Sequence, residues 1–269
     1  MREYRARIVD EILRDKLEAK GAILIEGPKW CGKTTTALQV ANSVLRMDEP
    51  SKRESNLKMS EIDPSRLLQG VTPRLIDEWQ IAPKIWDAVR YEVDCRGEEG
   101  QFILTGSAVP VETKEITHSG AGRFTWLTMR TMSLYESQES SGEVSLEDLF
   151  DSPDKISGSN AHDIDSLAFL ICRGGWPHAI GMKRKAALSQ AEDYFDAVVK
   201  SDINRADGVN KNPERVKRLM RSYARYQGAQ ITGTALRDDI FANETETISE
   251  DTVLSYVNAL KKIFVIEDM

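Results

Sequence analysis

The sequence has few cysteines and histidines and no long hydrophobic run. Its 269 residues include three cysteines, which are odd in number, widely spaced and unlike any metal-binding pattern. The histidines His118, His162 and His178 stand apart from one another, so a histidine-based metal site is not expected. The apolar runs Ala22–Ile25 and Leu167–Cys172 fall far short of the ~20 residues that a membrane-spanning helix needs. We therefore expect a protein of a reducing compartment, the cytoplasm, without membrane association.

The charge balance and composition are those of an ordinary globular protein. Lys and Arg number 36 and Asp and Glu number 43, which gives a net charge of −7. This acidic balance argues against a protein whose whole surface binds nucleic acid, although a local basic face remains possible. Apolar residues at 41% and charged residues at 29% allow a buried core in one large or two modest domains. The first residues are charged with no apolar segment behind them, so no secretory signal is expected.

The first half of the chain alternates short apolar runs with segments that have the helical spacing of apolar residues. The runs that predict strands are Ala22–Glu26, Ser43–Met47, Arg74–Ile76, Gln101–Thr105 and Phe124–Met129. The segments that predict helices are Arg7–Lys20, Lys33–Ala41 and Pro83–Val93. Strands that alternate with helices in this way predict an α/β fold, in which a parallel sheet lies between two layers of helices.

The second half has a different composition. From Glu136 to Asn160 the chain is rich in Ser, Glu, Asp and Gly, which predicts a surface connection with one short helix near Leu146–Phe150. The candidate helices beyond it are Ala186–Lys200, Pro213–Gln227, Thr234–Ile240 and Glu250–Ile263. We therefore predict three parts: an α/β core over residues 1–137, a connection and lid over 138–184, and a helical domain over 185–269.

The segment Gly27–Thr34 reads GPKWCGKT and matches the phosphate-binding pattern G-x-x-x-x-G-K-[ST]. It lies between a predicted strand and a predicted helix, which is the context that this pattern requires. Glycines let backbone N–H groups converge on phosphates, and the start of the following helix adds a partial positive charge. Lys33 would neutralise the β- and γ-phosphates, and the Thr34 hydroxyl would bind Mg²⁺. The predicted nucleotide-binding residues of this segment are Gly27, Pro28, Lys29, Trp30, Cys31, Gly32, Lys33, Thr34 and Thr35.

Two other nucleotide-binding patterns are absent from the sequence. GTP-binding proteins use an N-K-x-D loop, and the nearest string, Asn210–Pro213, lacks the aspartate. A dinucleotide-binding fold needs G-x-G-x-x-G after its first strand, and Pro28 and Lys29 interrupt that pattern. Both absences disfavour these two families.

Cys31 lies inside the loop, close to the start of the following helix. A thiol in this position can have a lowered pKa, so alkylation of Cys31 would block nucleotide binding. The alternative is a small side chain packed beneath the loop.

Two acidic residues, Asp77 and Glu78, end the predicted strand of the segment RLIDEWQ. Asp77 follows Lys33 by 44 positions, and an acid at the end of a buried strand can bind Mg²⁺ beside the loop. Glu78 is then placed to activate an attacking water as a general base. The alternative is a solvated corner without a catalytic role.

Four more residues are candidates for contact with the nucleotide. Thr105 and Ser107, in ILTGS, could face the γ-phosphate or the water; a plain transition from strand to loop is the alternative. Arg123, in GAGRF, could act as a catalytic residue that stabilises the transferred phosphoryl group, in its own site or in that of a neighbouring copy. A surface salt bridge is the alternative for Arg123. Arg173, in RGGWP, belongs to the segment that would close over the nucleotide.

Together these motifs resemble the additional-strand class of P-loop ATPases, and more narrowly a poorly characterised family of AAA+-like prokaryotic ATPases. The matching segments are GPKWCGKTT (27–35), PRLIDEWQ (73–80), FILTGSA (102–108), GAGRF (120–124), SLYES (133–137), RGGWP (173–177) and ISEDTVLSYVNALKKIFVIED (248–268). The resemblance implies an ATP-binding parallel sheet with an additional strand, followed by an all-helical, winged-helix-like domain of unknown function. Family members usually continue into a nuclease-like region, whereas this sequence ends at Met269, and Phe264–Glu267 supplies only the first half of a wing.

We expect a Mg²⁺-dependent ATP-binding protein that hydrolyses ATP slowly and couples its nucleotide state to movement of the helical domain. The partner of that domain would be another protein or DNA. The acidic net charge and an arginine from a neighbouring copy permit a homo-oligomer. A small-molecule kinase is disfavoured because the sequence contains no motif for an acceptor substrate.

The alternative function is a DNA-binding regulator in which ATP is only a ligand. It rests on Arg218, Arg221 and Arg225, which share one face of a predicted helix and could contact phosphates. A solvated face is the other interpretation of these arginines. The last predicted helix begins with Glu250 and Asp251, which a DNA duplex would repel, and this favours a protein contact or a lid.

Overall fold

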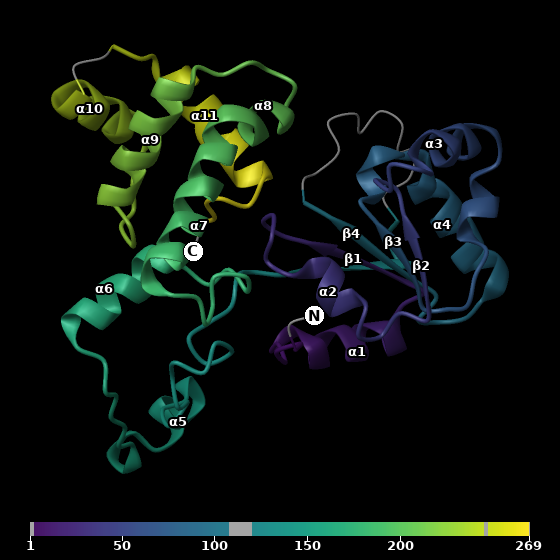
Figure 1. Cartoon of the computed structure of the whole chain (residues 1–269), viewed down its shortest axis with the longest axis horizontal. Coiled ribbons are helices and arrows are strands. Elements are labelled where there is room, and N and C mark those ends of the chain that lie inside the picture. The colour runs from purple at the N-terminus through teal and green to yellow at the C-terminus, as the bar shows by residue number, and fades with distance from the viewer. Residues whose placement is uncertain (1–2, 108–119, 245–246, 269) are drawn as a thin grey trace.

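A five-stranded parallel sheet forms the centre of the N-terminal part of the chain (Figure 1). The computed structural model describes residues 3–107, 120–244 and 247–268, so Ala108, His118 and Met269 lie outside the described residues. The strands are β1 (Ala22–Glu26), β2 (Ser43–Arg46), β3 (Arg74–Asp77), β4 (Phe102–Gly106) and β5 (Phe124–Thr128). Their order is β2-β3-β4-β1-β5, so β4 is inserted between β1 and β3. The predicted α/β sheet is therefore confirmed.

Side chains along each strand point alternately to the two faces of the sheet, and each face has a hydrophobic core. The odd-numbered residues Ile23, Ile25 and Ile103 pack with α1 (Val9–Ala19) and α2 (Lys33–Ala37) on one face. The even-numbered residues Leu24 and Leu104 pack with α4 (Lys84–Arg96) on the other, where α3 (Arg53–Ile62) and η1 (Pro64–Leu68) complete the layer. Side chains of successive strand residues point to opposite faces, so runs with apolar residues at every position predict strands buried on both sides.

The register of the sheet brings the carboxyl ends of four strands to one edge. Asp77 of β3 pairs with Thr105 of β4, and Glu26 of β1 pairs with Gly106 of β4 and with Thr128 of β5. Residues that directly follow β1, β3 and β4 must therefore lie close together, although they are far apart in the sequence. This edge is where ligands bind in open parallel sheets.

The rest of the chain is helical (Figure 1). Its elements are α5 (Leu146–Asp151), η4 (Pro153–Lys155), α6 (Ile164–Arg173), α7 (Arg184–Ala197), the π-helical turn Val198–Asp202, α8 (Ile203–Arg205), α9 (Pro213–Arg225), α10 (Gly233–Glu244) and α11 (Glu250–Lys262). Local sequence determines where α9 begins, because the Asn212 side chain accepts hydrogen bonds from the N–H groups of Glu214 and Arg215, and Pro213 occupies the first helical position. Among the described residues, no helix has the length and apolar character needed to span a membrane.

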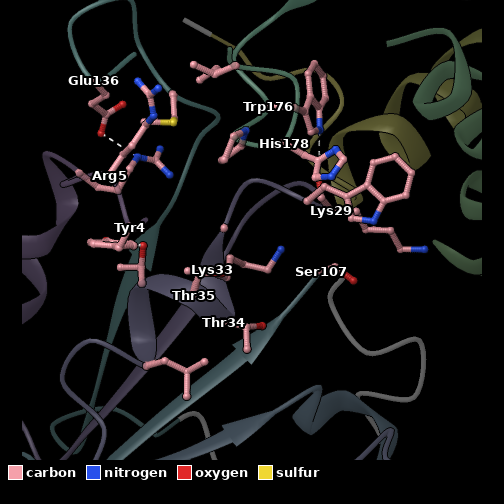
Figure 2. Close-up of a pocket in the computed structure, with 18 of the residues that line it drawn as sticks. Tyr4, Arg5, Lys29, Lys33, Thr34, Thr35, Ser107, Glu136, Trp176 and His178 are labelled. Atoms are coloured by element: carbon pink, nitrogen blue, oxygen red, sulfur yellow. Dashed lines mark hydrogen bonds and ion pairs between the residues drawn. The ribbon is translucent and has the colours of Figure 1, made fainter. Parts of the chain in front are cut away.

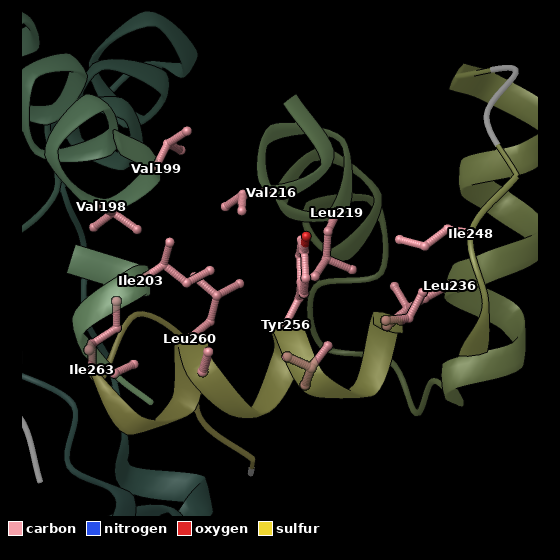
Figure 3. Packing of buried hydrophobic residues seen from close by; sticks show 14 of the residues in the cluster. Val198, Val199, Ile203, Val216, Leu219, Leu236, Ile248, Tyr256, Leu260 and Ile263 are labelled. Carbon is pink, nitrogen blue, oxygen red and sulfur yellow. The ribbon is translucent and has the colours of Figure 1, made fainter. Parts of the chain in front are cut away.

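Helix α11 contributes several side chains to the core of the helical part (Figure 3). Tyr256, Leu260 and Ile263 point from α11 and its end toward Val198 and Val216 of the neighbouring helices. All five are buried in one apolar cluster that is separate from the two clusters of the sheet. The helical part therefore has a hydrophobic core of its own.

Two details differ from the sequence predictions. The segment Phe264–Glu267 forms no strand: Phe264 has a φ of 59°, and the Val265 N–H donates to the Leu260 oxygen, so the chain turns at the end of α11. The expected half of a wing is therefore wrong. Helix α6 was not predicted, although Ile164, Leu167, Ala168 and Ile171 follow helical spacing; in the structure Ile164 and Ile171 are 84% and 80% exposed.

Candidate nucleotide-binding site

The loop between β1 and α2 depends on glycine at two positions. Gly27 follows β1 with a φ of 146°, and a Cβ there would lie 2.0 Å from the backbone oxygen of Met129. Gly32 has a φ of 105° and directly precedes α2. Glycine tolerates these φ values, whereas other residues avoid them. The segment Gly27–Gly32 can therefore curve closely past the end of β5 before the helix begins.

Lys33 is the first residue of α2, and its side chain lies in the curve of the loop (Figure 2). It is buried, and its Nζ donates hydrogen bonds to the backbone oxygens of Gly27 (2.9 Å) and Pro28 (2.8 Å). Burial lowers the pKa of Lys33, and the charges of Glu78 and Asp77 oppose part of this change. The ammonium group is thus held where phosphate oxygens would replace the two carbonyl acceptors.

Asp77 joins the loop helix to two strands. Its Oδ1 accepts hydrogen bonds from the Thr34 hydroxyl (2.7 Å) and from the Thr105 hydroxyl (2.6 Å). The structure thus brings together three predicted site residues that come from α2, β3 and β4. Carboxylate and hydroxyl oxygens are the ligands that Mg²⁺ prefers, so Thr34 and Asp77 fit this ion.

Glu78 follows β3 in the left-handed backbone conformation, with φ 57° and ψ 43°, and the chain turns there into η2 (Trp79–Ile81). Its Oε2 accepts a hydrogen bond from Nε2 of Gln80 at 2.5 Å. Burial raises the pKa of Glu78 and the charge of Asp77 raises it further, while Gln80 and Lys33 act in the opposite direction. The result is a half-buried carboxylate beside the loop lysine.

A cleft of about 2640 Å³ separates these residues from the helical part (Figure 2). The predicted site residues that line it are Lys29, Trp30, Gly32, Lys33, Thr34, Thr35, Glu78 and Ser107. Residues 3–8, the connection near Glu136 and the helical part near Tyr194 form the other walls. Small-molecule sites enclose about 300–1,000 Å³, so the cleft has room for a nucleotide and for movement of its walls.

Arg7 fixes the tip of the loop, and no motif pointed to it. Its guanidinium donates to the backbone oxygens of Cys31 and Arg130, both at 2.9 Å, and to the Glu136 carboxylate at 2.9 Å. Glu136 also accepts hydrogen bonds from the backbone N–H groups of Ile8 and Ser133, both at 2.8 Å. Burial alone would raise the pKa of Glu136, but these hydrogen bonds hold it below its ordinary value. A buried ion pair therefore connects residues 7–8, the loop and the connection.

The loop also contacts the helical part. Nζ of Lys29 lies 2.5 Å from Oδ1 of Asp202, and the Trp176 indole N–H donates to the Lys29 backbone oxygen at 3.2 Å. The Tyr194 ring lies 5.9 Å from the Trp30 ring and 4.6 Å from the Trp176 ring, measured between centroids. These are side-chain contacts across the cleft that sequence patterns could not reveal.

Two predicted arginines lie away from the loop. Arg123 directly precedes β5, its backbone oxygen accepts from the N–H of Ala22, and its guanidinium pairs with Asp94 at 2.7 Å. It therefore stands at the amino ends of the strands, about 15 Å of strand from the loop at ~3.3 Å per residue. This corrects the expected role in its own site; a role in a neighbouring copy stays a prediction. Arg173 is buried and paired with Glu139.

Cys31 is packed beneath the loop. Its side chain is fully buried, and Sγ lies 3.4 Å from the Met129 backbone oxygen, to which it donates. Burial raises the pKa of the Cys31 thiol, and the charge of Lys33 only partly opposes this. The hypothesis of an activated thiol is therefore wrong, because burial raises the pKa of Cys31 although the residue lies close to the start of α2.

Comparisons with known proteins agree with this geometry. The Walker-type ATPase PABY2304 of Pyrococcus abyssi has the same fold, with a TM-score of 0.54 and 13% identity over 94% of this chain and 88% of that one. The fold is thus that of a P-loop ATPase. Residues 19–138 match the model of an AAA domain, and residues 164–269 match a domain of unknown function (DUF8612). The first part of the chain is thus similar to AAA domains, and its last part is similar to this second domain.

Two curated relatives are similar over nearly the whole chain. They are the uncharacterized proteins Mb2031c of Mycobacterium bovis and Rv2008c of Mycobacterium tuberculosis, each 23% identical over 261 residues. The alignment covers 96% of this chain and 51% of each relative. The chain thus spans about half the length of the curated relatives that it matches.

We predict that brief alkylation of the native protein modifies Cys95 and Cys172, which are exposed, and spares Cys31. Burial and the raised pKa keep the Cys31 thiol protonated and inaccessible. Mass spectrometry of peptides, with urea-unfolded protein as the control, measures this. Labelling of Cys31 at the rate of the two exposed thiols would contradict the structure.

Glu136→Gln should destabilise the protein by about 2 kcal/mol at pH 7, because it weakens the buried pair with Arg7. The folded-state pKa of Glu136 is lowered, so its contribution is complete above the ordinary value of 4.5 and is lost as the pH falls below it. Urea unfolding at pH 7 and near pH 3 should therefore give a variant effect that shrinks in acid. Glu18→Gln, at an exposed position, is the control. If the two proteins differ in unfolding free energy by the same amount at both pH values, the charge of Glu136 does not cause the difference.

Proposed function

We propose that the chain binds Mg²⁺-ATP at the loop Gly27–Thr34 and hydrolyses it slowly. The supporting observation is that a buried ammonium, a pair of oxygen ligands and a half-buried carboxylate meet at one edge of the sheet. These groups are Lys33, Thr34 with Asp77, and Glu78. Phosphoryl transfer requires mainly positioning and neutralisation of charge, which this set of residues can supply.

Each residue has a role in the proposed reaction. Lys33 would exchange its two carbonyl acceptors for phosphate oxygens and hold the transferred group. Thr34 and Asp77 would hold Mg²⁺, which supplies neutralising charge when it is bound. Glu78 would accept a proton from the water whose oxygen attacks the γ-phosphorus, while the bond to ADP breaks and ADP leaves with the electron pair.

We also propose that nucleotide binding changes how the helical part is held. Lys29 and Trp30 belong to the loop that would surround the phosphates, and both contact the helical part. A phosphate beside Lys29 would compete with Asp202 for the same ammonium group. Nucleotide and helical part would thus be linked through one loop, and the helical part would carry the change to a protein partner.

The DNA-binding alternative has less support. On α9, Nε of Arg225 donates to Asp239 at 3.1 Å, which directs this arginine to α10. Helix α11 begins with Glu250 and Asp251, which would repel a duplex. We therefore favour a protein partner.

Lys33→Ala should weaken ATP binding at least about tenfold, which corresponds to ~1.4 kcal/mol. Glu78→Gln should bind ATP as well as the parent protein but hydrolyse it about 10²–10⁴ times more slowly, because it lacks the general base. Calorimetry with Mg²⁺-ATP and phosphate-release assays measure the two effects. Lys58→Ala, on the exposed face of α3, is the control. Glu78→Gln with parental turnover would remove Glu78 from its proposed role.

Asp202→Asn should increase ATP affinity severalfold, on the order of 1 kcal/mol or less for a partly exposed pair, because Lys29 no longer has a competing acceptor. Asp196→Asn is a matched control: Asp196 lies on α7 and pairs with Lys200 away from the loop. Calorimetry compares the affinities, and hydrogen exchange follows α7 with and without ATP. Identical affinities for parent and Asp202→Asn would end the coupling proposal.

A further inference from the structure

The side chain of Gln80 lies between the Glu78 carboxylate and the end of β4. Glu78 stands just before η2 and Gln80 lies within this turn, so both side chains reach the same cleft. Nε2 of Gln80 donates to Oε2 of Glu78 at 2.5 Å. Gln80 thus directly contacts the proposed general base.

Gly106, the last residue of β4, leaves room for the Gln80 amide. A Cβ at this position would lie 2.6 Å from Oε1 of Gln80 and 3.2 Å from Nε1 of Trp79. The amide is therefore packed directly against the backbone of β4, one residue before Ser107. Glycine at this strand end has a spatial reason: any larger residue would displace Gln80.

The side-chain oxygen of Gln80 makes no favourable polar contact in the part of the chain that the structure describes. Oε1 is buried and has no hydrogen-bond partner among the described residues. A buried amide oxygen without a partner is unfavourable, and such exceptions require an explanation. The hydrogen bond from Nε2 of Gln80 to Glu78 explains this arrangement, because it fixes the Glu78 carboxylate.

The charges around Glu78 explain why a fixed orientation matters. Lys33 attracts the Glu78 carboxylate, whereas Asp77 and Asp48 repel it. Without another contact, these forces would draw the carboxylate toward the ammonium group that the phosphates need. The neutral amide of Gln80 donates a hydrogen bond to this carboxylate and so holds it without adding charge.

We infer that Gln80 is a positioning residue, which holds the Glu78 carboxylate away from Lys33 and toward the attacking water, and that Gly106 supplies the space for it. This inference rests on the proposed ATP hydrolysis. It also connects the position of the β4 end, beside Ser107, to the orientation of Glu78. A shift of β4 would move the Gln80 amide and the carboxylate with it.

Gln80→Met keeps the length and bulk of the side chain but removes the donor. We expect ATP affinity within about threefold of the parent and turnover about 10- to 100-fold lower, since small misplacements of a catalytic group cost rate rather than binding. Gln69→Met, an exposed position away from the cleft, is the matched control. Calorimetry, phosphate release and melting temperature are measured for each variant.

A double-mutant cycle tests whether Gln80 acts through Glu78. In the Glu78→Gln background, Gln80→Met should cause no further loss of turnover, because the base is already absent. Gly106→Ala should lower turnover in the parent and have little added effect with Gln80→Ala, where the space is free. If Gln80→Met folds poorly, the comparison of Gly106→Ala in the parent and in Gln80→Ala still tests the proposal.

The outcomes separate the two proposals. Full turnover in Gln80→Met, or additive losses in the cycle, overturns the role of Gln80 and leaves ATP hydrolysis intact if Glu78→Gln is inactive. Equal losses of affinity and turnover also overturn it, because they indicate a general defect of the site. A parent protein that binds ATP without hydrolysing it overturns both the proposed hydrolysis and the role of Gln80, and leaves only the proposed ATP binding in place.

Discussion

One buried carboxylate, that of Asp77, holds the candidate site together. A charged group at the end of a buried strand is costly unless it is paired or hydrogen-bonded. Asp77 accepts from Thr34 at the start of the loop helix and from Thr105 on the neighbouring strand. These bonds fix α2, β3 and β4 relative to one another. The parallel register makes this possible, because it brings the ends of these strands to one edge.

The loop is held from both sides by parts of the chain far from it in sequence. Arg7 fixes the Cys31 backbone from residues before α1, and Asp202 and Trp176 contact Lys29 from the helical part. When a phosphate-binding loop also contacts a second domain, binding of a charged phosphate at the loop can change the position of that domain. The fold of P-loop ATPases accommodates many functions, so the proposal rests on these contacts and not on the fold.

Most of the fold could be predicted from the sequence. The five strands and the loop were found because each leaves a local pattern: an apolar run, or glycines and a lysine at fixed spacing. The pair Asp77–Glu78 was recognised for the same reason. The helical character of residues 185–268 was also predicted, whereas the wing strand is not formed, and α6 was not predicted although its apolar residues follow helical spacing.

The sequence by itself determined the elements and the identity of the phosphate-binding loop, because these follow from spacing within one segment. Tertiary structure alone decided which distant groups meet. It directed Arg123 to Asp94 at the far ends of the strands, buried Cys31, and brought Arg7 to the loop and Gln80 to Gly106. Strand order and register govern these contacts, since they determine which residues far apart in the chain lie side by side in space.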